Sequence, residues 1–188
     1  MSNHRITFEI TMFRIDQTVE ENKYSIYLRL IDQNNFDILE RVILKDKTFL
    51  SMKDKYGNSF LHESIKSRNR NVAEFLLKSG IDVNIRNNEG DTPLHLAFHY
   101  GKYKEIDLLL KYGADINALN NLNQTPMNYY SYNIRVYNII YLLKLGADPT
   151  IADSFGNTIL YYLNKQYNVS KETGELCVNI CKLIWNIH

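Results

Sequence analysis

The chain has 188 residues, of which 45% are hydrophobic and 23% are charged, a composition typical of one ordinary globular domain. Its 22 basic and 21 acidic side chains nearly cancel, so it lacks the excess positive charge that attracts nucleic acids, and we expect no nucleic-acid partner. No uninterrupted apolar stretch approaches the roughly 18 residues that cross a bilayer, and the N-terminus lacks the apolar run of a signal peptide. We therefore expect a cytoplasmic protein with no membrane partner.

Residue usage gives two further indications. Cys177 and Cys181 are the only cysteines, too few for a disulfide framework, which favours a reducing compartment. Asn, Ile, Lys and Tyr are abundant and Ala is scarce, the pattern of A/T-rich codons. Such a genome is typical of a large DNA virus or a host-restricted bacterium, and a viral protein would act in the host cytoplasm or nucleus.

The N-terminal 19 residues differ from the rest of the chain. Residues 6–12 alternate apolar and polar side chains, which predicts a short strand. Residues 1–19 share no pattern with the sequence that follows, so we expect them to form a separate N-terminal arm.

From residue 53 onward the sequence repeats with a period of 33. Members of three series recur at this spacing: Gly80, Gly113 and Gly146; Asp82, Asp115 and Asp148; and Leu61, Leu94, Met127 and Leu160. In the second copy, Thr92 is placed to cap a helix that Pro93 begins. Ile106 and Leu109 lie on one face of a second helix, which Gly113 is expected to end in a left-handed conformation.

This pattern resembles the ankyrin repeat, because the second copy reads Asp91-Thr92-Pro93-Leu94-His95 and later Gly113-Ala114-Asp115. The resemblance implies an all-α solenoid of stacked helix-turn-helix units with short β-turn fingers. We predict copies at about 53–85, 86–118, 119–151 and 152–188, preceded by a degenerate capping repeat at 20–52.

The outer copies depart from the family pattern. The first has Ser59-Phe60 in place of Thr-Pro, and the third has Asn128 in place of the usual His. The fourth aligns only after nine inserted residues, which we place near 167–175. Terminal copies are expected to be atypical because one face meets water.

Residues that could carry chemistry are better explained by structure. His95 and His99 have the spacing of a zinc-binding pair, but no Glu follows His95, and the resemblance implies a local bond across the turn instead. Cys177 and Cys181 have only His188 as a nearby third ligand, so we expect buried thiols. The repeated Asp residues fit turn chemistry. We therefore predict no metal, no cofactor and no enzymatic activity.

We predict a monomeric protein-interaction module that binds a protein partner on the concave ankyrin surface, with a host immune-signalling protein as one candidate. The alternative is a substrate-recognition adaptor of a ubiquitin ligase, although the chain ends at His188, where we expect the last repeat to end. The resemblance places these residues on the concave face: Lys55, Tyr56, Asn58, Lys66, Asn88, Glu89, Asp91, His99, Tyr100, Asn121, Leu122, Gln124, Tyr132, Ser154, Phe155 and Asn157.

Two alternatives concern side chains in these loops. Tyr56, Leu122 and Phe155 either contact the partner or pack on one another along the row of fingers. Asn84 and Asn117 resemble the ankyrin asparagines that asparaginyl hydroxylases modify; otherwise they only bond the turn.

Overall fold

The computed structural model describes residues 20–129 and 136–166, which contain eight α-helices, one 3-10 helix and no strand. The elements in chain order are α2 (Glu20–Asp32), α3 (Phe36–Lys45), η1 (Lys47–Ser51), α4 (Phe60–Lys66), α5 (Arg70–Lys78), α6 (Pro93–His99), α7 (Tyr103–Lys111), α8 (Val136–Lys144) and α9 (Ile159–Gln166). The predicted strand at 6–12, the insertion near 167–175 and both cysteines lie outside the described residues.

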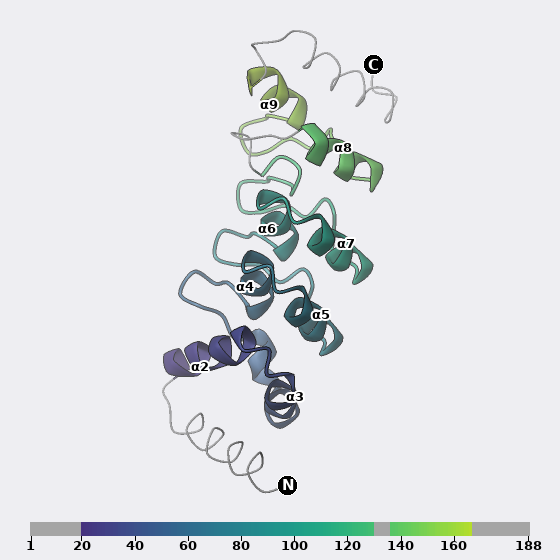
Figure 1. The fold of residues 1–188 in the computed structure, drawn as a ribbon. Coiled ribbons are helices and arrows are strands. Elements are labelled where there is room, and N and C mark those ends of the chain that lie inside the picture. The colour runs from purple at the N-terminus through teal and green to yellow at the C-terminus, as the bar shows by residue number, and fades with distance from the viewer. Residues whose placement is uncertain (1–19, 130–135, 167–188) are drawn as a thin grey trace, which may run out of the picture.

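The helices form two parallel rows, with α4, α6 and α9 in one and α5, α7 and α8 in the other (Figure 1). Within a repeat α4 packs on α5 and α6 on α7, and α4 also packs on α6 in the next repeat. The predicted all-α repeat solenoid is confirmed. No helix in the described ranges has the length and apolarity needed to cross a membrane.

The core follows the period of 33. Leu76, Leu109 and Leu142 occupy the same position in successive second helices, and each is fully buried. A pair of amphipathic helices this short cannot bury its apolar faces alone, so the stack shares one continuous core.

The predicted start and end of the helices in the second copy are confirmed. Thr92 is the N-cap of α6, which begins at Pro93. After α7, Gly113 has a φ of 85°, and the N–H of Ala114 donates to the carbonyl of Leu109 at 3.0 Å. This geometry satisfies the last carbonyls of α7, and glycine adopts it without strain.

The N-terminal helix pair packs on the first clear repeat through aromatic rings. Phe60, at the position where α6 has Pro93, is fully buried and stacks on Tyr24 of α2 at 4.5 Å and on Phe49 of η1 at 4.6 Å between ring centroids. The departure from Thr-Pro therefore has a structural cause: a proline would remove the ring that stacks on both Tyr24 and Phe49.

The N-terminal pair matches the later repeats only in part. Leu39 and Ile43 of α3 are buried like Val72 and Leu76, to which they align, but Leu44 is 77% exposed. The boundary of a capping repeat at 20–52 stays a prediction.

Replacing Phe60 by Ala should destabilise the chain by about 3 kcal/mol or more, because the change leaves a cavity between α2, η1 and α4. Urea unfolding followed by circular dichroism measures this loss. The control is Leu44→Ala at an exposed site, which should change the free energy of unfolding by less than about 0.5 kcal/mol. Equal effects of the two substitutions would contradict the aromatic contact.

Candidate partner-binding groove

Four loops, here called fingers 1 to 4 (residues 53–59, 86–92, 119–125 and 152–158), precede α4, α6, the turn at 126–129 and α9 in that order. Near its start each finger has an Asp or Asn whose Oδ1 accepts two backbone N–H groups at 2.8 to 3.0 Å: Asp54, Asn87, Asn120 and Asp153. These bonds fold the finger into a tight turn. This series was not predicted from the sequence, although it recurs every 33 residues.

Neighbouring fingers are hydrogen-bonded through their backbones. The N–H of Asn88 donates to the carbonyl of Tyr56 at 3.0 Å, and the same bond joins fingers 2 and 3 at 3.0 Å and fingers 3 and 4 at 2.8 Å. A Cβ on Gly90 would lie 2.7 Å from the backbone nitrogen of Asn121, so only glycine permits this approach. The finger tips therefore form one continuous row.

Buried histidines join each first helix to the next finger. Nδ1 of His95 accepts from the N–H of Thr92 at 3.1 Å, so the ring proton is on Nε2, which donates to the carbonyl of Gln124 at 3.0 Å. His62 makes the equivalent bonds to Ser59 and Asp91. The structural interpretation of His95 is thus confirmed.

In the third repeat Asn128 replaces the imidazole. Its Oδ1 accepts from the N–H and the hydroxyl of Thr125, and its Nδ2 donates to the carbonyl of Ile151 at 3.3 Å. A side-chain amide therefore makes the same kind of link with no titratable group.

Several predicted partner-binding side chains face solvent. Tyr56 is 61% exposed, Leu122 48% and Phe155 72%, values that do not fit side chains packed on one another. The other exposed members of the predicted set are Lys55, Lys66, Asn88, Glu89, Tyr100, Asn121 and Ser154. Asn58, His99, Gln124 and Asn157 are half-buried, and Tyr132 lies outside the described residues.

The prediction for Asp91 is wrong. We predicted it to be available on the concave face, but it is fully buried. Its Oδ1 accepts from Nδ2 of Asn120 at 2.9 Å, and the hydroxyl of Tyr129 donates to its Oδ2. The side chain therefore lies between finger 3 and the turn that contains Tyr129, beneath the surface.

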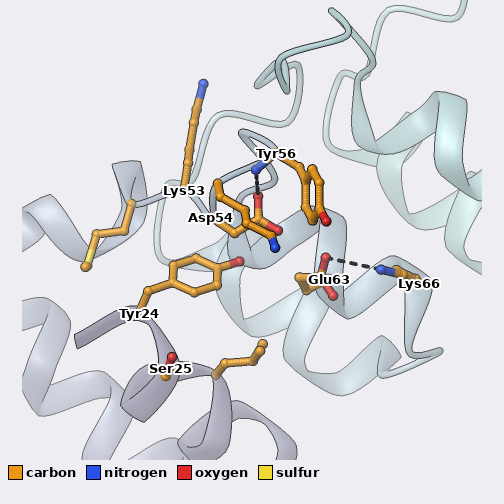
Figure 2. Close-up of a pocket in the computed structure, with 10 residues that line it drawn as sticks. Tyr24, Ser25, Lys53, Asp54, Tyr56, Glu63 and Lys66 are labelled. Carbon is orange, nitrogen blue, oxygen red and sulfur yellow. Dashed lines mark hydrogen bonds and ion pairs between the residues drawn. The ribbon is translucent and has the colours of Figure 1, made fainter. Parts of the chain in front are cut away.

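Two adjacent hollows form a concave groove. The N-terminal hollow, of about 750 Å³, lies between α2, finger 1 and α4 (Figure 2). The inter-finger hollow, of about 280 Å³, lies between fingers 1 and 2 and the ends of α4 and α6. Tyr56 and Lys66 line both, so the two hollows are adjacent.

Some residues that line this groove were not predicted from the sequence. Glu63 lines the N-terminal hollow, and its equivalents Leu96 and Tyr129 line the inter-finger hollow, so the 33-residue register contained a signal for them. Tyr24 and Leu28 of α2 gave no such signal, because residues 20–52 barely follow the repeat.

The N-terminal hollow contains both signs of charge. Burial, followed by the charges of Asp54 and Glu63, raises the pKa of Tyr24, whose hydroxyl donates to the carbonyl of Asn58 at 3.2 Å. Nζ of Lys66 lies 3.7 Å from Oε1 of Glu63, and Nζ of Lys55 lies 4.9 Å from the ring centre of Tyr56.

The loops after the second helices contain the repeated Asp residues. Oδ1 of Asp82 accepts from the N–H of Asn84, and Oδ1 of Asn84 accepts from the N–H of Asp115, both at 2.9 Å. Asn117 and Asp148 repeat the second bond at 2.9 Å. The turn role of the Asp series is confirmed, and both asparagines bond the next repeat. Hydroxylation of Asn84 and Asn117 stays a prediction.

No group of three His, Cys, Asp or Glu side chains within residues 20–129 and 136–166 has the arrangement of a metal site.

Residues 50–97 and 78–130 match the family model described as ankyrin repeats in many copies. No curated protein matches the chain.

The buried His62 predicts a loss of stability in acid. Burial is the main cause that lowers its pKa from 6.5 to about 4, so the unfolded chain binds a proton more readily than the folded chain. Stability from this group is complete above about pH 6.5 and declines as the pH falls toward 4, by about 2 kcal/mol between pH 7 and pH 5.

Urea unfolding at a series of pH values measures this dependence. The comparison variant is His62→Asn, which takes its side chain from the third repeat, where Asn128 supplies a donor and an acceptor without a titration. Its stability should fall less steeply over this range than that of the wild type; an identical slope would contradict the role of His62.

Proposed function

Residues 50–130 make this chain an ankyrin-repeat protein, and we propose that it binds a protein partner in the concave groove defined above. Ankyrin repeats are general protein–protein interaction modules. The observation that carries the proposal is the row of exposed Tyr56, Leu122 and Phe155 at the finger tips, which begins at the two adjacent hollows that Tyr56 lines. Large apolar side chains that are exposed together mark interaction surfaces.

The size and rigidity of the groove support a partner segment rather than a small ligand. Hollows of about 750 and 280 Å³ together accommodate several side chains. The fingers are fixed by backbone hydrogen bonds before a partner arrives, which lowers the entropy cost of binding. On this proposal the chain is a cytoplasmic monomer that acts by binding and not by catalysis.

The residue usage typical of A/T-rich genomes supports a narrower proposal, a partner supplied by a host cell, with immune-signalling proteins as the first candidates.

Replacing Tyr56 and Tyr100 by Ala together should weaken partner binding by about 2 kcal/mol or more, because exposed tyrosines concentrate binding energy at interfaces. The melting temperature should stay nearly constant, since neither ring belongs to the core. The partner is isolated from host-cell lysate with the chain as bait, and its affinity is measured by calorimetry.

The matched control is Leu44→Ala, an exposed apolar side chain on α3 that lines neither hollow. Normal binding by the double variant, or an equal loss in the control, would show that the partner binds elsewhere.

A further inference from the structure

The inter-finger hollow has aromatic walls. Tyr56, Tyr100 and Tyr129 line it together with His99, whose ring contacts Tyr100 at 4.6 Å and Tyr129 at 5.9 Å between centroids. Its volume of about 280 Å³ suits one long side chain. The faces of aromatic rings carry partial negative charge and attract cations.

A buried carboxylate lies beside this hollow. Asp91 is fully buried, and its two side-chain partners, Asn120 and Tyr129, are neutral donors, so no cation within the described part of the chain pairs with it. The hydroxyl that bonds Asp91 belongs to Tyr129, which lines the hollow. The unpaired negative charge thus lies one side chain away from the cavity.

The other repeats show that this charge is not needed for the finger. The equivalent positions are Asn58, Gln124 and Asn157, all uncharged. Oδ1 of Asn58 accepts from Nδ2 of Asn87 at 3.1 Å, just as Oδ1 of Asp91 accepts from Asn120. An amide makes the finger bond in that repeat, whereas the carboxylate at position 91 adds a second acceptor oxygen, which Tyr129 bonds, and a negative charge.

The remaining charged groups around the hollow are carboxylates and lysine ammonium groups. Glu89 is exposed at the rim, and Lys66, the one cation among the described residues that line the hollow, is directed toward Glu63. Burial lowers the pKa of His99, so its imidazole adds no positive charge near neutral pH. Ammonium groups of the chain already lie near two of the rings, Lys55 4.9 Å from Tyr56 and Lys102 5.7 Å from Tyr100.

We propose that the inter-finger hollow binds an arginine side chain of the partner, whose guanidinium stacks on the tyrosine rings and pairs with Glu89 while the field of Asp91 attracts it. Arginine fits better than lysine because its planar group stacks on aromatic faces and offers five N–H donors. This inference rests on the proposed function and specifies a basic residue in the segment that occupies the groove.

The probe is N-acetyl-arginine amide, titrated into the full ¹⁵N-labelled chain and followed by NMR. We expect saturable shifts of the backbone amides of Asn88, Glu89 and Tyr100. The citrulline analogue, which is nearly isosteric but uncharged, should bind at least about fivefold more weakly. Equal binding of the two probes, or shifts confined to other residues, overturns the inference.

Variants that remove a negative charge and a variant that removes a positive charge should have opposite effects on arginine binding. Glu89→Gln and Asp91→Asn should each weaken arginine binding about threefold or more, whereas Lys66→Gln should strengthen it, because it removes a competing cation. Glu89 and Lys66 are exposed, so these two changes leave the fold intact even if Asp91→Asn perturbs it. Glu74→Gln on α5, which lines neither hollow, is the control and should have no effect.

The two proposals fail in different ways. If the isolated partner loses affinity on Tyr56→Ala and Tyr100→Ala but arginine and citrulline probes bind equally, the groove binds a protein and only the arginine inference is wrong. If the arginine probe binds as expected but the partner does not compete with it, the proposed function of the groove is wrong.

Discussion

One buried polar side chain in each of the first three repeats, three residues after a Ser or Thr, links that repeat to the next. His62, His95 and Asn128 each accept hydrogen bonds from the Ser or Thr three residues earlier and donate one to the backbone of the next finger or the loop before it. The carbonyls of Asp91 and Gln124 each also accept the backbone N–H of Asn87 or Asn120 at 3.0 Å, so the imidazole adds a second hydrogen bond to a carbonyl of the next repeat. The bond therefore fixes both the start of a helix and the distance to the following repeat.

Most of this architecture could be predicted from the sequence, because the period of 33 is set by local physics. Thr92-Pro93 starts a helix and Gly113 ends one, since each residue favours that backbone conformation wherever it occurs, and both predictions are confirmed. The N-terminal pair was harder to predict, because its packing depends on rings far apart in sequence. Nothing in the alignment of Leu44 with Leu77 indicated that one is exposed and the other buried.

The 33-residue register predicted which positions belong to the candidate site, but it did not predict which of their side chains are buried. Positions such as Lys55, Tyr100 and Phe155 are exposed as expected, because the repeat places them at finger tips or helix ends. Asp91 was misplaced because its burial depends on Tyr129, a ring at a position where the first repeat has Glu63 and the second has Leu96. The fourth repeat has the equivalent Tyr162, which donates to Asp153 of its own finger, whereas Tyr129 donates to Asp91 of the preceding finger. The repeat register therefore does not predict which Asp such a tyrosine contacts.

The departures from the repeat are therefore of two kinds. Phe60 and Asn128 replace a family residue but are accounted for by packing and hydrogen bonding: one stacks on two rings, and the other makes the bonds that histidine makes elsewhere. Asp91 is of the other kind: Asn58 makes the same finger bond without the cost of burying a charge, and the carboxylate differs in its charge and in the bond that it accepts from Tyr129. This buried charge lies next to a cavity lined by tyrosines, so its field acts on that surface as well as on the core.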